Sequence, residues 1–130
     1  ISTFHSEDSQ IELYSFDSMP LNQLLMRCSM MITDYSSACW DVYYQGKPVL
    51  FYQFDVDDYN RTNGSYLNME NDLFGDRCTE QEDLVHLIKD YAENGFQEKQ
   101  KYAEMRKEYF AYIDHNNCQR TYEYIKSQGY

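Results

Sequence analysis

Residues 30–53 read MMITDYSSACWDVYYQGKPVLFYQ, and this stretch decides the fold. Two apolar runs, Met30–Thr33 and Val49–Gln53, enclose a polar turn and a segment whose apolar residues recur at helical spacing. That order predicts a strand, a tight turn, a helix and a second strand. Because one short helix connects them, the two strands are expected to be adjacent and parallel at the centre of the sheet, with a right-handed crossover.

The connecting helix is predicted over residues 36–45. Gly46 is well placed as its C-terminal cap, and its apolar stripe consists of Ala38, Cys39, Val42 and Tyr43. The polar turn before this helix therefore lies at the carboxyl end of the first strand, which is where open α/β sheets bind their ligands.

The residues upstream predict a second unit of the same kind. Ile11–Phe16 alternates with the period of a strand. Asp17 or Ser18 can cap a following helix that has Pro20 in its first turn and an apolar face of Leu21, Leu24, Leu25 and Cys28. Together the two units predict a βαβαβ core over residues 10–54, an α/β fold with a Rossmann-like parallel sheet. Because the chain opens so shortly before a strand, we expect it to be a piece of a longer one.

The second half of the chain is predicted to be a loop followed by helices, within one domain over residues 1–130. Residues 55–78 read as a long acidic and polar loop, of a length that usually serves a site or a docking surface. Thr79 and Glu82 form a capping box for a helix that runs through Tyr91 and ends at Gly95. Helices over about 97–113 and up to 128 follow, the last one capped by Asn116 or Asn117 with Cys118, Tyr122 and Ile125 directed inward.

Composition excludes several classes of protein. With 22 acidic and 11 basic residues the formal net charge is -11, which disfavours a nucleic-acid backbone or an anionic membrane surface as a direct partner. The four cysteines show no CxxC pair, and the acidic run at 55–58 lacks the spacing of an EF-hand, so no metal site is expected. Any anion that binds must be held by local geometry against the overall charge.

The turn of Asp34, Tyr35, Ser36 and Ser37 admits two interpretations. In the first it is only a serine-capped helix start, with the aspartate bonding nearby backbone N–H groups. In the second the serine hydroxyls and backbone amides hold the phosphates of a nucleotide diphosphate. Asp41 lies four residues after Ser37, so its carboxylate could accept hydrogen bonds from the ribose beside that diphosphate; alternatively it is a solvated helix acid.

A longer ordered set of motifs resembles a known family. Residues 32–37, Asp41, residues 47–55, Asp58-Tyr59, residues 64–66 and Gly75 closely resemble the C-terminal half of the CDP-glycerol glycerophosphotransferases, the teichoic acid primases and polymerases of bacterial envelopes. The similarity extends more loosely through the helix after Thr79 to the region of Cys118 and Arg120. As an ordered set these motifs are strongly specific, although each alone would be weak.

The resemblance implies a GT-B-type enzyme in which this chain is part of the lobe that binds the CDP-activated donor. It implies transfer of glycerol phosphate, or a related polyol phosphate, to a lipid-linked teichoic acid or capsule-type acceptor at the cytoplasmic face of the membrane, with no cofactor or nucleotide-site metal. By position, Ser36, Ser37 and Thr33 fall at the donor phosphates, and Asp34, Tyr35 and Asp41 near the ribose and nucleotide.

The chain also departs from the family pattern. It has no counterpart of the family's His-Pro segment before the serine turn, and no lobe that supplies a catalytic base, so the resemblance implies no catalytic residue here and an isolated piece that is inactive. A sheet cut before its first strands would expose an edge, through which the chain could form a homo-oligomer. Two other functions remain open: a non-catalytic domain that binds a protein partner, and a nucleotide-sugar glycosyltransferase of the same architecture.

Overall fold

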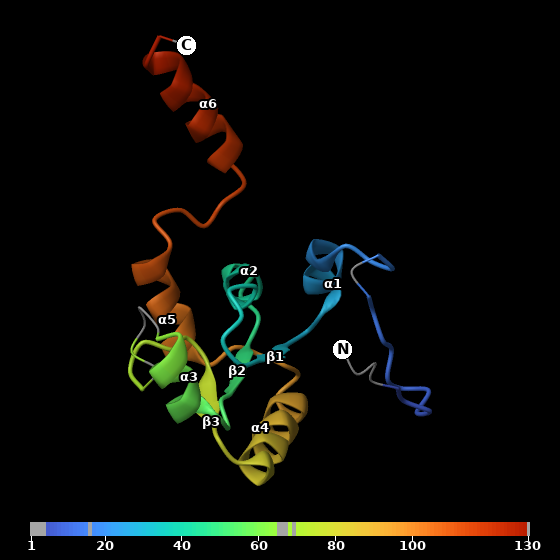
Figure 1. Ribbon diagram of the computed structural model, residues 1–130. Coiled ribbons are helices and arrows are strands. Elements are labelled where there is room, and N and C mark those ends of the chain that lie inside the picture. The colour runs from blue at the N-terminus through green and yellow to red at the C-terminus, as the bar shows by residue number, and fades with distance from the viewer. Residues whose placement is uncertain (1–4, 16, 65–67, 69, 130) are drawn as a thin grey trace.

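The computed structural model describes residues 5–15, 17–64, 68 and 70–129. In these residues a small parallel sheet is surrounded by helices (Figure 1). The strands are β1 (Met31–Thr33), β2 (Val49–Tyr52) and β3 (Asp76–Cys78). The helices are α1 (Leu21–Arg27), α2 (Cys39–Tyr44), α3 (Val56–Thr62), α4 (Gln81–Glu93), α5 (Gln100–Tyr109) and α6 (Asn117–Ser127). The predicted α/β class with a parallel sheet is confirmed.

The sheet has the order β1-β2-β3 with all neighbours parallel. Met31 pairs with Val49 and Thr33 with Phe51, so the two strands predicted from residues 30–53 are adjacent and parallel. Only β2 is central, however, because β1 has no second neighbour among the described residues. β2 is apolar and almost completely buried, as a strand between two others must be.

Helix α2 connects β1 to β2, as predicted, but it is shorter than the predicted segment. Ser36 and Ser37 form turns in which their carbonyls accept bonds from Cys39 and Trp40, and the helix begins after Ala38. Gly46 follows with a φ of 77°, a left-handed conformation that ends the helix as expected. In Figure 1 α2 lies above the strands and α4 below them.

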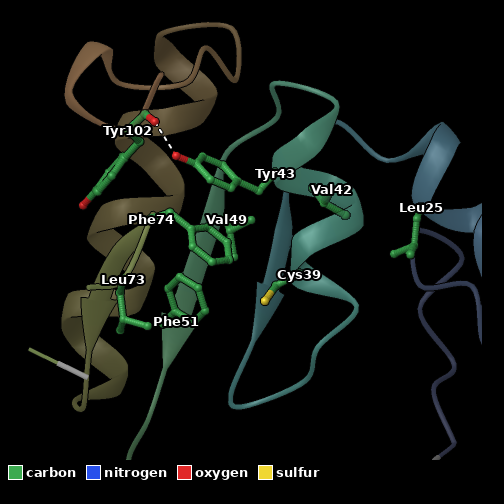
Figure 2. Packing of buried hydrophobic residues seen from close by; sticks show 9 residues of the cluster. All are labelled: Leu25, Cys39, Val42, Tyr43, Val49, Phe51, Leu73, Phe74 and Tyr102. Atoms are coloured by element: carbon green, nitrogen blue, oxygen red, sulfur yellow. Dashed lines mark hydrogen bonds between the residues drawn. The ribbon is translucent and has the colours of Figure 1, made fainter. Parts of the chain in front are cut away.

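The core lies between α2, β2 and α5. Figure 2 shows Tyr43 extending from α2 over Phe74 toward α5, where its hydroxyl donates to the backbone carbonyl of Tyr102 at 2.6 Å. The rings of Tyr43 and Phe74 are stacked with centroids 4.2 Å apart. Val42, Tyr43 and Val49 are fully or almost fully buried, and each such side chain stabilises the fold by about 1.5–3 kcal/mol. The predicted apolar face of residues 38–43 is therefore confirmed.

The interpretation of residues 55–78 as one polar loop is wrong. The segment contains α3 and ends in β3, which pairs with β2 through Leu50 and Asp76. A strand of sequence Asp76-Arg77-Cys78 has no apolar alternation to predict it. It forms because its polar groups find partners: the Asp76 carboxylate accepts bonds from Tyr91, Tyr102 and Lys99.

The predicted strand at Ile11–Phe16 is also wrong for residues 11–15, and Phe16 lies outside the described residues. Ile11 and Leu13 are about half exposed, and no strand pairs with them. A strand needs a neighbour for its backbone groups; instead the N–H of Ser15 donates to the Ser18 hydroxyl and the N–H of Ser18 to the carbonyl of Ser15. Within the described residues, the βαβαβ core predicted for 10–54 is therefore a single βαβ unit.

Several predicted helix ends also differ from the structure. Pro20, not Asp17 or Ser18, is the N-cap of α1, and Leu25 is the buried residue of that helix. Glu80 precedes α4 without a side-chain cap, so the capping box of Thr79 and Glu82 does not form. Gly95 does follow α4 in a left-handed conformation, as predicted.

The last helix is not packed as expected. Helix α6 extends away from the sheet in Figure 1, and Asn116 precedes it without a side-chain cap bond. Cys118, Tyr122 and Ile125, expected to face inward, are exposed. The stripe that predicted an inward face exists, but no described segment packs against it.

Candidate functional site

The candidate site lies at the carboxyl edge of the sheet. Because the three strands are parallel, their carboxyl ends meet there. Thr33 ends β1 and is followed by the turn 34–37, Tyr52 ends β2 and is followed by Gln53–Asp55, and Cys78 ends β3. Five of the six residues singled out by the sequence, residues 33–37, are thus placed at this edge.

The serines of this turn are exposed and do not cap α2 in the usual way. The N-cap position belongs to Ala38, which provides no side-chain cap. The Ser36 hydroxyl is 3.4 Å from the N–H of Ala38, which is long for a hydrogen bond. The Ser37 hydroxyl has no hydrogen-bond partner within the described ranges. Both hydroxyls therefore remain able to donate to a ligand.

Tyr35 connects the turn to the segment after β2. Its hydroxyl donates to the Asp55 carboxylate at 2.9 Å, and its ring stacks on that of Tyr59 at a centroid distance of 3.6 Å. Burial and this hydrogen bond raise the pKa of Tyr35 well above its usual value. Asp34 accepts from the N–H of Tyr35 at 2.6 Å. These contacts hold the turn in one conformation.

Asp41, the sixth residue, is exposed in the first turn of α2. It lines a groove of about 420 Å³ together with residues of α2, α5, the segment between α5 and α6, and the first residue of α6, namely Trp40, Tyr44, Tyr109, Phe110, Ala111, Tyr112 and Asn117. Its backbone carbonyl accepts from the Gln45 amide at 2.9 Å. The carboxylate is accessible, and its proximity to a ribose stays a prediction.

A buried glutamine at this edge was missed by the sequence interpretation. Gln53 has no exposed surface. Its amide nitrogen donates to the carbonyl of Asp34 at 3.1 Å, its amide oxygen accepts from the Nε of Arg77 at 2.8 Å, and its backbone N–H donates to Cys78. The one available signal was a polar residue at the end of an apolar strand. Gln53 joins the ends of all three strands.

The described residues do not offer a metal site. No group of three or more histidine, cysteine, aspartate or glutamate side chains in that part of the chain could hold an ion. The histidines are also dispersed: His86 is exposed on α4, and His115 lies between α5 and α6.

The chain is similar to known wall-polymer proteins. Residues 2–127 match the family described as CDP-glycerol:poly(glycerophosphate) glycerophosphotransferase. The chain is 34% identical over 104 residues to the minor teichoic acid biosynthesis protein GgaB of Bacillus subtilis, which covers 79% of this chain and 11% of that protein. It is 33% identical over 78 residues to a teichoic acid poly(ribitol-phosphate) polymerase of Bacillus spizizenii, a match that covers 59% of this chain and 13% of the polymerase.

A third relative is the teichoic acid glycerol-phosphate primase of Bacillus spizizenii, 35% identical over 72 residues, covering 55% of this chain and 19% of the primase. The chain thus spans between 11% and 19% of the length of these three relatives.

Proposed function

The chain belongs to the CDP-glycerol:poly(glycerophosphate) glycerophosphotransferase family, and from that membership we propose that it binds the CDP-activated donor of a polyol-phosphate transferase. The observation that carries this proposal is the exposed serine turn at the carboxyl edge of a parallel sheet, in a chain matched by the family over residues 2–127. The product would be a teichoic acid or a capsule-type polymer, and the polyol would be glycerol or a related polyol such as ribitol.

In the proposed reaction an acceptor hydroxyl attacks the phosphorus that carries the polyol. The bond from that phosphorus to the bridging oxygen breaks, CMP leaves with the electron pair, and the hydroxyl proton passes to a base. Ser36, Ser37 and Thr33 would donate hydrogen bonds to the donor phosphates, and Asp34, Tyr35 and Asp41 would lie near the ribose and nucleotide. Donors directed at the leaving group stabilise the charge that develops on it.

The base and the acceptor are proposed to belong to other parts of the enzyme. His86 is exposed on α4 and His115 lies between α5 and α6, and the sequence has no His-Pro pair before the turn. The acceptor would be a lipid-linked polyol phosphate at the cytoplasmic face of the membrane. None of the described helices is long and apolar enough to cross a bilayer. Because the base is proposed to lie in another part of the enzyme, residues 1–130 alone would not turn over substrate.

The test is transfer from CDP-glycerol by the longest natural polypeptide that carries residues 1–130, compared with the Ser36→Ala, Ser37→Ala double variant. Each lost hydrogen bond to a phosphate should lower kcat/KM roughly ten- to a hundredfold. Ser127→Ala is the matched control, because the Ser127 hydroxyl bonds only at the end of α6, to the carbonyl of Tyr124 and from the amide of Gln128.

Three outcomes would contradict the proposal. Retained activity with a lowered melting temperature in the double variant would make the serines a structural cap. Preference for nucleotide sugars over CDP-polyols would make the parent a glycosyltransferase. Failure of the wild-type polypeptide to bind CDP-glycerol or CMP would favour a protein-interaction domain.

A further inference from the structure

The Gln53 bridge leads to a residue that the motifs do not include. Arg77 stands on β3, opposite Phe51 in the strand register, and its Nε donates to the Gln53 amide oxygen at 2.8 Å. The same glutamine donates to the carbonyl of Asp34, the first residue of the serine turn. One fully buried side chain therefore connects the guanidinium of Arg77 to the backbone of the turn.

Burying the Gln53 amide is costly unless both of its polar atoms are paired. The amide oxygen is paired with the Nε of Arg77, which leaves the N–H groups of the two terminal guanidinium nitrogens available to a ligand. Gln53 thus restrains the position of the Arg77 guanidinium. Fixed donors lose less entropy when they bind an anion than mobile ones do.

The charge of Arg77 is not compensated within the described part of the chain. Three other arginines have carboxylate partners: Arg61 pairs with Asp58, Arg106 with Glu98 and Arg120 with Asp114. Arg77 has no carboxylate within ion-pair distance in the described ranges, although acidic residues outnumber basic ones two to one. An arginine that is half-buried and unpaired in so acidic a chain points to an anion from outside.

We propose, on the basis of the function proposed above, that Arg77 binds the donor diphosphate beside Ser36 and Ser37, and that Gln53 is its positioning residue. The guanidinium supplies a local positive charge in a chain of net charge -11. Its planar fork can take two phosphate oxygens at once and adds a full positive charge, which serine hydroxyls do not have.

The experiment is calorimetric titration of CDP into the longest natural polypeptide with these residues, as wild type, Arg77→Gln and Arg77→Lys. Arg77→Gln should weaken CDP binding roughly ten- to a hundredfold, the loss of a hydrogen bond to a charged group. Arg77→Lys keeps the charge but not the fork, so its affinity should fall between those of the other two proteins. Arg61→Gln is the matched control and should bind CDP as the wild type does, because Arg61 is exposed and paired with Asp58.

A merely structural role gives a different result. If Arg77 only pairs with Gln53, Arg77→Gln and Arg77→Lys should lower CDP affinity equally. The difference in affinity from the wild type should then not diminish as the salt concentration is raised. Unchanged CDP binding in Arg77→Gln would overturn the inference while transfer from CDP-glycerol by the wild type still supported the proposed function. Weaker CDP binding in Arg77→Gln, together with no transfer from CDP-glycerol by the wild type, would support the phosphate site at Arg77 and contradict the proposed transferase function.

Discussion

Gly75 is the position where a single methyl group is expected to damage the fold most. It immediately precedes β3 and is buried. A Cβ built on Gly75 would lie 2.1 Å from the carbonyl oxygen of Val49, 2.9 Å from the carbonyl carbon of Val49 and 3.0 Å from a ring carbon of Phe51. The side chain of an alanine would thus overlap the backbone of the central strand.

The neighbours of Gly75 cannot move without cost. β2 is held by ladders on both sides, so displacing Val49 strains its pairing with Met31 and opens the contact with β3. Forcing extra atoms into a packed interior costs about 1–3 kcal/mol and occasionally more. Since the overlap is with backbone, we expect Gly75→Ala to destabilise the chain by about 3 kcal/mol or more, a large share of the roughly 5–15 kcal/mol of a typical domain.

The assay is urea unfolding of the 130-residue chain followed by the fluorescence of Trp40, its single tryptophan, whose ring lies 4.3 Å from that of Phe74. With an m value of about 1–3 kcal/mol/M, the midpoint should fall by about 1–3 M. Gly95→Ala is the control: Gly95 has a φ of 65° and nothing within 4 Å of its built Cβ, so only the left-handed strain of about 1–2 kcal/mol applies. A loss in Gly75→Ala no larger than in Gly95→Ala would refute the steric argument.

Three further results are expected. Burial opposes ionisation of Asp76, but hydrogen bonds from Lys99 and two tyrosines outweigh burial and lower the pKa of this carboxyl group. The ionised Asp76 therefore stabilises the fold above the unfolded pKa of about 4, and this stabilisation is lost as the pH falls further. Acid unfolding of Asp76→Asn should not show this loss of stability. Tyr43→Phe removes the hydrogen bond from its hydroxyl to the carbonyl of Tyr102, which should cost about 0.5–1.5 kcal/mol in the same urea assay. Ile32 is exposed on the outer strand β1, so Ile32→Lys should reduce any self-association measured by sedimentation equilibrium. An association constant equal to that of the wild type would exclude this edge as the interface.

The sequence predicted the part of the fold whose signals are local. β1, β2 and the helix between them follow from hydrophobic runs within 24 residues, and Gly46 ends the helix for a reason visible in the sequence itself. β3 was not predicted, because its residues are polar and its place depends on β2, on the space that Gly75 leaves, and on tyrosines from α4 and α5. These partners lie far away along the chain.

The errors at the two ends of the chain have one physical origin. Apolar residues alternate at 11–15 and form a stripe on α6. Each pattern shows which surface could be buried, but both surfaces are exposed. Amphipathic periodicity predicts which side of a segment would face a partner, but a strand or helix becomes packed only when a partner is present. Among the described residues neither segment has one.

The candidate site shows the same division between local and distant signals. Residues 33–37 could be placed at the carboxyl edge because strand, turn and helix are consecutive in the sequence. The hydrogen bonds of Gln53 to Asp34 and Arg77 could not be predicted, because these residues lie 19 and 24 positions away from Gln53 in the sequence. A parallel sheet places consecutive strand ends at one edge whatever the length of the connections. For that reason a polar residue that closes an apolar parallel strand, such as Gln53, is the kind of position at which partners from neighbouring strands should be sought.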